Sequence, residues 1–397
     1  MKISIRKFIF WLILFGIALT PFLSIAEVYA LLQGLMSDTS KALTPVYLKA
    51  MKDILFLFIL SLGIIVFLKE TKIHYFDKYF LVLILLSIAS MLISFPMTTL
   101  MACASGIRWL LPLLLIPVIY RSVDTNLQNK INTIMVFILI TSCILQVFQA
   151  IYFPSFFGRT FFGLNKRNPG IFLIPTSMAA FTMVSMFYCF HFSPNGLIKK
   201  TVLYLIGPLS IFLTGSGTGV LILMAFYLCL LYSKILQKGL FVTLTPLMLI
   251  VMIVIMPILV GRSHIYVSLL ARVNIFLSNV LDPKNALISM RFGEATNTMV
   301  LVNTSSLSFN AMGHKGFIAD STLTSIACNV GFVALVVFAL LMIKFVRQEL
   351  IFMHFLVIFV GFMVSTIIFE MFPINLLFAV NLAYLRKIQN ENQAYIT

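Results

Sequence analysis

The residues best suited to chemistry in this sequence are cations gathered in one short segment. The stretch FFGRTFFGLNKRNPG, residues 156–170, carries Arg159, Lys166 and Arg167 and contains no acidic residue. Guanidinium groups bind phosphate well because their fork of donors matches two oxygens at once. The segment therefore predicts contact with an anionic, phosphate-bearing partner. The alternative is that these side chains reach lipid phosphates at a membrane surface.

A second basic segment, residues 261–317, also lies between apolar runs. Its charged residues are Arg262, Arg272, Lys284, Arg291, Lys315, Asp282 and Glu294. Five cations against two acids leave a net charge of +3, and residues 152–170 also carry +3. A single cation beside a membrane usually contacts lipid phosphate. Two basic segments on one face of a membrane favour a binding site for an anionic partner.

The composition defines the class of protein that must position these cations. Of the 397 residues, 61% are hydrophobic and only 10% are charged, and the mean hydropathy is +1.08. A soluble domain is about half apolar and about a quarter charged. We therefore expect an all-α polytopic integral membrane protein with a single transmembrane domain over residues 1–397. The net charge of +16 is explained by basic cytoplasmic loops, so we expect no nucleic-acid partner.

Apolar runs of suitable length predict about twelve transmembrane helices, since a span needs about 20 apolar residues. The expected spans are 8–26, 53–68, 79–96, 106–120, 131–151, 171–190, 201–214, 219–233, 240–260, 318–343, 351–369 and 371–385. Residues 201–233 could instead form a re-entrant hairpin. The glycines of GSGTG, residues 215–219, predict a tight turn there rather than a dinucleotide site, because no strand precedes them.

The distribution of cations predicts the orientation. When the N-terminus is placed inside, more than half of the 28 Lys and Arg residues fall at inner span ends and short inner loops. Both termini are then cytoplasmic, and the segments 152–170 and 261–317 lie outside. The cations before Phe8 resemble a signal peptide, but the many later spans favour an uncleaved first helix.

Two helices are expected in the outer segment 261–317. Apolar spacing over residues 261–281 predicts a helix on the membrane surface, which Asp282-Pro283 would end. A second helix, over about residues 285–298, would present Arg291. The scattered cysteines and histidines suggest no metal cluster, so we expect neither a metal nor a cofactor.

Several stretches together resemble a known family. Arg159 is followed, after ten residues, by Gly170, and NPGIFLIPTSMAAF then enters the next span. FLTGSGTGVLILMAF and GHKGFIADSTLTSIACNVGFVALVVF follow in order. In motif order, spacing and loop sizes the chain resembles bacterial O-antigen polymerases of the Wzy type, which belong to a superfamily with the O-antigen ligases. The resemblance implies a GT-C-like membrane glycosyltransferase with its active site facing the periplasm of the inner membrane.

Two features distinguish this chain within that superfamily. The ligases carry His where this chain has Asp320, which favours a polymerase. Polymerases often repeat the Arg–ten–Gly motif in the second large loop, but no glycine stands at that spacing after Arg262, Arg272 or Arg291. Arg291 is the preferred second arginine because it lies on the expected second helix.

The resemblance implies a substrate of undecaprenyl diphosphate carrying an oligosaccharide repeat unit. The growing glycan would move from its diphosphate lipid onto a new lipid-linked unit. Arg159, with Lys166 or Arg167, would grip the diphosphate, and Arg291 would approach from the other loop. Gly170 would allow a sharp turn or a close approach to the ligand. Fixed guanidiniums stabilise the negative charge that the leaving diphosphate gathers.

The remaining site residues concern the proton of the acceptor hydroxyl and the substrate contacts. Asp320, Glu294 and His314 are candidate bases, and Asp320 is the one placed by the resemblance. Asp320 could equally be the N-cap of the following span. Arg272 and His314 are further candidate substrate-binding residues.

The expected partners are the undecaprenyl-diphosphate-linked oligosaccharide, membrane lipids and, by resemblance, a chain-length regulator protein. Two other functions stay open. One is an O-antigen ligase that transfers finished glycan to lipid A core. The other is a flippase or transporter of lipid-linked sugars, which would place ionisable residues along a central cavity. A scaffold role would leave the basic outer segments unexplained.

Overall fold

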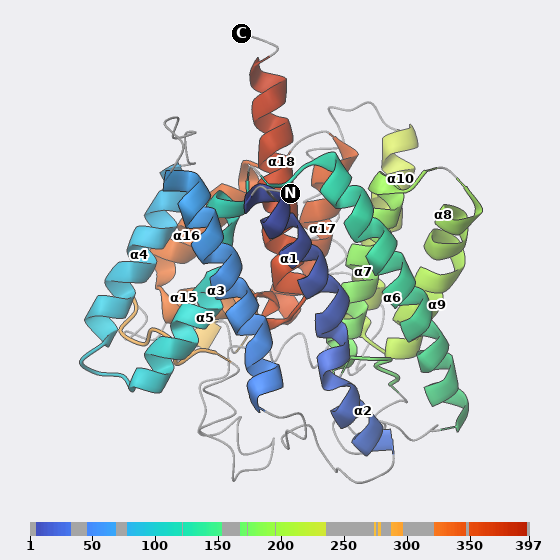
Figure 1. The fold of residues 1–397 in the computed structure, drawn as a ribbon, viewed down its shortest axis with the longest axis horizontal. Helices are drawn as coiled ribbons and strands as arrows, with labels where there is room; N and C mark the ends of the chain where they lie inside the picture. Colours follow the sequence, from blue (N-terminus) through green and yellow to red (C-terminus); the bar gives the residue numbers. More distant parts are fainter. Residues whose placement is uncertain are drawn as a thin grey trace. The chain divides into compact units, whose positions relative to one another are not determined.

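The computed structural model describes residues 5–32, 46–68, 78–120, 122–152, 167–172, 174–194, 196–235, 274, 277–278, 287–296, 321–346 and 349–394. Within these ranges the chain forms helices, turns and bends, with no β-strand (Figure 1). A helix satisfies its own backbone hydrogen bonds, which is why long apolar runs adopt it. The expectation of an all-α chain is confirmed for these residues.

Three helical stretches of the described chain are long and apolar enough to cross a membrane. They are Ala102–Ile119, Thr125–Tyr152 and Leu197–Thr214. Shorter apolar helices cover Lys78–Ser94, Gly217–Leu231, Phe332–Ile343 and Leu350–Ser365. The helices therefore have the length and composition of a helical membrane protein, and the number of about twelve spans stays a prediction.

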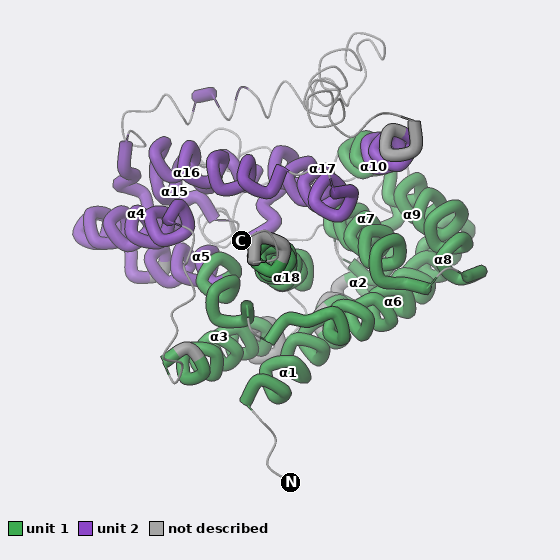
Figure 2. The backbone as a smooth tube through the Cα atoms, turned by 90° about the horizontal axis from the view of Figure 1, so that it is seen from above, with its two compact units in different colours: residues 1–72, 112–223, 371–397 green, residues 73–111, 224–370 purple. Residues whose placement is uncertain are grey.

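The chain forms two compact units (Figure 2). Unit 1 contains residues 1–72, 112–223 and 371–397. Its helices are α1 (Ile5–Leu19), α2 (Ile25–Leu32), α3 (Val46–Leu68), α6 (Thr125–Tyr152), α7 (Pro175–Phe192), α8 (Leu197–Thr201), α9 (Gly207–Thr214) and α18 (Ile374–Ala394). A 3₁₀ turn, Thr20–Ser24, joins α1 to α2, and a π-helical turn, Val202–Ile206, joins α8 to α9.

Helix α7 is the centre of unit 1. Every residue from Met178 to Cys189 is buried, so α7 has no exposed face over this length. Helices α6 and α9 pack against α7, and α6 also packs against α1 (Figure 2, green). The irregular segment that precedes α7 therefore lies beside the best-packed part of the unit.

Unit 2 contains residues 73–111 and 224–370. Its helices are α4 (Lys78–Ser94), α15 (Thr322–Asn329), α16 (Phe332–Ile343) and α17 (Leu350–Ser365). Helices α5 (Leu100–Ile119) and α10 (Gly217–Ile235) contribute residues to both units. Helix α16 packs on α4, and α15 contacts α16 and α17. Trp109 and Phe338 both meet the ring of Phe369, at centroid distances of 5.3 and 6.1 Å.

The run expected to form one span at 318–343 is two helices. Helix α15 ends at Asn329 and α16 begins at Phe332. Gly331, between them, has φ of 115°, a conformation that side chains other than glycine rarely adopt. A Cβ at Gly331 would also meet the backbone of Leu287 and Ile288. The break therefore makes room for another segment of unit 2, which apolar periodicity alone does not reveal.

The tight turn expected at residues 215–219 is confirmed. Gly215 has φ of 59° at the end of α9, and α10 begins at Gly217. The expected span 240–260 lies outside the described residues. Of the expected surface helix at 261–281, only residues 274, 277 and 278 are described, and they are helical.

The contact between α3 and α5 in unit 1 depends on Gly63. A Cβ at this position would overlap the side chain of Val118. Overpacking of a tight contact typically costs about 1–3 kcal/mol. We expect Gly63→Leu to lower the thermal unfolding temperature of the detergent-solubilised protein. Ser61→Leu, at an exposed position of the same helix, is the matched control. Equal unfolding temperatures for the two variants would contradict this packing.

Candidate functional site

Four of the predicted site residues are described, namely Arg167, Gly170, Arg291 and the candidate base Glu294. Arg167 and Gly170 belong to unit 1, and Arg291 belongs to unit 2. The others lie outside the described residues; they are Arg159, Lys166, Arg272, His314 and Asp320. The two basic segments therefore belong to different units.

In unit 1, residues 167–172 form a turn that leads into α7; we refer to it as the Gly170 turn. The side-chain amide of Gln149 on α6 pairs with the Gly170 backbone in both directions. Gln149 Nε2 donates to the Gly170 carbonyl, and the Gly170 N–H donates to Gln149 Oε1, each at 2.9 Å. Gln146 Nε2 donates to the Asn168 carbonyl at 2.8 Å. Two glutamines one turn apart thus replace the backbone partners that this irregular segment lacks.

Glycine is required at position 170 for two reasons. Its φ of 66° is in the left-handed region, and a Cβ there would overlap Ser142 Oγ on α6. Ser142 Oγ also accepts the Ile171 N–H at 3.2 Å. The sharp turn expected at Gly170 is confirmed, and its close neighbour in the structure is helix α6.

Gln146 is itself held by hydrogen bonds to α9 and, through it, to α7. Ser210 Oγ donates to Gln146 Oε1 at 2.8 Å, and Thr182 Oγ1 lies 2.9 Å from Ser210 Oγ. Gln146, Gln149, Thr182 and Ser210 are all fully buried. The Asn168 N–H donates to the Leu213 carbonyl of α9 at 2.9 Å. Helices α6, α7 and α9 therefore fix the backbone immediately after Arg167, whose side chain is half-buried.

In unit 2, residues 287–296 form the second anchored segment, which we call the Arg291 segment. The sequence predicted a helix over about 285–298, and this is wrong for residues 287–296, which are bends and turns. Gly293 has φ of 85°, and a Cβ there would overlap the Ala102 carbonyl of α5. A Cβ at Gly106 would press on the Phe292 ring. The segment is irregular because its backbone packs closely against α5, and this contact prevents a regular helix.

Asn329, the last residue of α15, is the main anchor of the Arg291 segment. Its Oδ1 accepts the N–H groups of Gly293 and Ala295, each at 3.1 Å. Its Nδ2 donates to the Ala295 carbonyl at 3.3 Å and to Ser325 Oγ at 3.1 Å. Ser325 Oγ donates to the same Ala295 carbonyl at 2.8 Å. One fully buried amide therefore satisfies both donor and acceptor groups of the turn.

Serines of α4 hold the other side of the Arg291 segment. Ser90 Oγ lies 2.8 Å from the Ser289 carbonyl and 2.7 Å from that of Asn329. Ser94 Oγ accepts the Phe292 N–H at 3.0 Å. Ser105 Oγ of α5 lies 2.6 Å from Thr296 Oγ1. The segment is thus fixed by α4, α5 and α15 together.

The anchored segment presents one cation and one carboxylate. The side chains of Arg291 and Glu294 are 21% and 39% exposed, and Arg291 Nε lies 4.0 Å from Glu294 Oε2. The Arg291 N–H donates to Ser289 Oγ, and the Glu294 N–H donates to the Arg291 carbonyl, both at 3.0 Å. A fixed backbone carrying a partly exposed guanidinium can bind phosphate oxygens with little reorganisation. The neighbouring carboxylate can orient it or accept a proton.

The N-cap role considered for Asp320 belongs to Ser321. Helix α15 begins at Thr322, and Ser321 Oγ accepts the Thr324 N–H at 3.1 Å. Serine is a favoured N-cap because its hydroxyl satisfies a free N–H of the first turn. The part of the prediction that made Asp320 the cap is therefore wrong.

The anchoring residues were missed by the sequence analysis, although their spacing carried a signal. Ser142, Gln146 and Gln149 recur at intervals of four and three residues, which places them on one face of α6. Ser90 and Ser94, four residues apart, do the same on α4. Neutral polar residues at helical spacing within apolar runs indicate a polar contact with another segment.

The described residues contain no group of three or more His, Cys, Asp or Glu side chains that could hold a metal ion. The cysteines, Cys103, Cys143, Cys189, Cys229 and Cys328, are buried and free.

Fold and site together define a class: an all-helical chain with membrane-length apolar helices, in which hydrogen-bonded turns carry arginines. No protein-family model matches the chain, and no similar curated protein or solved structure was found.

The two hydrogen bonds from Gln149 to the Gly170 turn generate a prediction. Leucine at position 149 would leave a buried N–H and a buried carbonyl without partners, each costing about 1–3 kcal/mol. We expect Gln149→Leu to lower the unfolding temperature clearly in detergent. Gln128→Leu is the matched control, because Gln128 is fully buried on the same helix and neither side-chain polar atom has a hydrogen-bond partner. That variant should be neutral or stabilising. The reverse order of stabilities would refute the role given to Gln149.

Proposed function

We propose that the chain is an O-antigen polymerase of the bacterial inner membrane. It would transfer a growing glycan from undecaprenyl diphosphate onto a new lipid-linked repeat unit at the periplasmic face. The substrate class comes from the resemblance of its motifs to that family. The twelve-span, GT-C-like arrangement with both termini cytoplasmic is part of the same proposal.

The observation that carries the proposal is the way unit 2 holds Arg291. Asn329, Ser90 and Ser94 are fully buried and direct their hydrogen bonds to the backbone of residues 289–295. Burying irregular backbone among apolar helices is costly unless its polar groups are hydrogen-bonded, and here the helices supply dedicated side-chain partners for it. The positioned groups are a guanidinium and a carboxylate, both partly exposed. This supports a site that handles a phosphate leaving group.

The proposed reaction assigns a role to each group. The bond between the donor sugar and the diphosphate oxygen breaks, and that oxygen keeps the electron pair. The acceptor hydroxyl forms the new glycosidic bond and loses its proton. Arg291 would stabilise the departing diphosphate. For Arg159 and for Lys166 or Arg167, the same role is what the family resemblance implies. Glu294, which lies on the same turn as Arg291, would take the proton in this proposal, with Asp320 and His314 as the alternatives.

The first test uses a strain that lacks this chain. We expect its lipopolysaccharide gel to show core capped by a single repeat unit, with long glycans lost. Bare core with long polymer still on the carrier lipid would mean that the chain is a ligase. Bare core with single units held on the inner leaflet would mean a flippase. Unchanged lipopolysaccharide would exclude all three functions.

The second test changes the two arginines in a complemented strain. Arg291→Lys keeps the charge but loses the two-oxygen fork, so glycan polymerisation should fall by at least about tenfold. Arg159→Ala should abolish long chains while the protein still reaches the membrane. Arg386→Lys on α18, where Arg386 contacts Gln389 at 2.7 Å, is the control and should stay active. A fully active Arg291→Lys variant would reduce Arg291 to a simple charge, and unchanged chains with Arg159→Ala would remove Arg159 from the site.

A further inference from the structure

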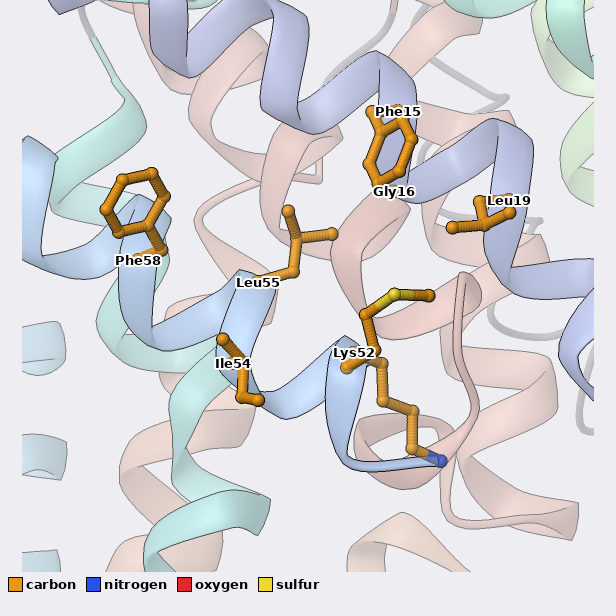
Figure 3. A pocket seen from close by; sticks show the side chains of 8 residues that line it. Phe15, Gly16, Leu19, Lys52, Ile54, Leu55 and Phe58 are labelled. Carbon is orange, nitrogen blue, oxygen red and sulfur yellow. The ribbon is translucent and has the colours of Figure 1, made fainter. Parts of the chain in front are cut away.

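An apolar groove runs between α1 and α3 in unit 1 (Figure 3). Its volume is about 150 Å³, and it is lined by Phe15, Gly16 and Leu19 of α1 and by Met51, Lys52, Ile54, Leu55 and Phe58 of α3. None of these residues belongs to the Gly170 turn or the Arg291 segment. The groove is therefore a feature that the proposed transferase site does not use.

The groove is open along one side. Phe15, Ile54 and Phe58 are 52%, 63% and 46% exposed, so the groove opens on its outer side between large apolar side chains. Gly16 brings the helices together at the groove, because a Cβ there would lie 2.6 Å from Leu55 Cδ2. A dry apolar cavity of about 150 Å³ accommodates a group as large as benzene. The groove thus has the size and lining to hold part of one hydrocarbon chain.

Lys52 gives the groove a polar end. Figure 3 shows its amino group at the far end of the groove from Phe58, directed away from the apolar side chains. Six residues of helix, or about 9 Å at about 1.5 Å per residue, separate Lys52 from Phe58. Lys49 and Asp53 are the other charged residues of this part of α3. An ammonium group at one end of an apolar channel matches a lipid with its phosphate at the same end.

We propose that this groove binds an anionic glycerophospholipid. One acyl chain lies along Phe15, Ile54 and Phe58, and the headgroup phosphate contacts the Lys52 ammonium. A glycerophospholipid is the better match than a prenyl diphosphate, because a single ammonium pairs with a single phosphate charge. A diphosphate favours several cations or arginine forks, and Lys52 is the single cation among the residues that line the groove. The proposal does not depend on the transferase function.

The test is tryptophan quenching by brominated lipids in bilayers that contain the full-length protein. The chain has two tryptophans, Trp11 and Trp109, and changing both to Phe gives a silent background. Phe15→Trp then reports from the groove, and Leu85→Trp reports from an exposed position of α4. Brominated phosphatidylglycerol and brominated phosphatidylcholine are compared at each reporter.

At the Phe15→Trp reporter we expect phosphatidylglycerol to bind about fivefold more tightly than phosphatidylcholine, the ratio expected for one lysine beside an anionic lipid. Lys52→Gln should bring this ratio to about one, and Lys52→Arg should preserve it. The Leu85→Trp reporter should show no preference in either background. No preference at the groove reporter, or a preference that survives Lys52→Gln, would overturn the proposal. Displacement of the brominated lipid by undecaprenyl phosphate, but not by an equal fraction of phosphatidylglycerol, would assign the groove to a prenyl carrier instead.

Discussion

The hydrogen bonding of buried, non-helical backbone is the constraint on which the rest of this structure depends. A helix satisfies its own N–H and C=O groups, but residues 167–172 and 287–296 do not form helices. Each buried group left without a partner would cost about 1–3 kcal/mol. The protein meets the need with side-chain amides, those of Gln146 and Gln149 in unit 1 and that of Asn329 in unit 2. An amide suits this task because it offers a donor and an acceptor side by side.

The same physical solution appears in both units, although their helices differ. In each, an arginine precedes a glycine of positive φ, Arg167 before Gly170 and Arg291 before Gly293. A helix comes so close to that glycine that an added Cβ would overlap it. In each, polar residues recur at helical spacing along one helix face, on α6 or on α4. The backbone is held rigidly while the side chains of Arg167 and Arg291 stay partly exposed. Such an arrangement suits binding of a phosphate whose charge grows during a reaction.

These anchors also explain the interruptions in otherwise apolar helices. The chain breaks between α15 and α16 at Gly331, where the backbone of Leu287 and Ile288 passes. Asn329 ends α15 at this break, so its side chain meets the segment that the break admits. These polar residues are compatible with apolar helices because they are buried and hydrogen-bond to the Arg291 segment. In the groove between α1 and α3, by contrast, it is large apolar side chains that stay exposed.

The sequence by itself determined the helical membrane class and the tight turn at residues 215–219. These follow from hydropathy and from backbone sterics, which act over neighbouring residues. It predicted Arg291 as a site residue but placed it on a helix, because apolar periodicity carries no information about a long-range partner. Only the tertiary structure decided that residues 287–296 are an anchored turn, that Ser321 caps α15, and that Gln149 and Asn329 are the anchors. A side-chain amide can replace helical hydrogen bonds only when folding brings it to the turn, and between Asn329 and Gly293 that contact spans 36 residues.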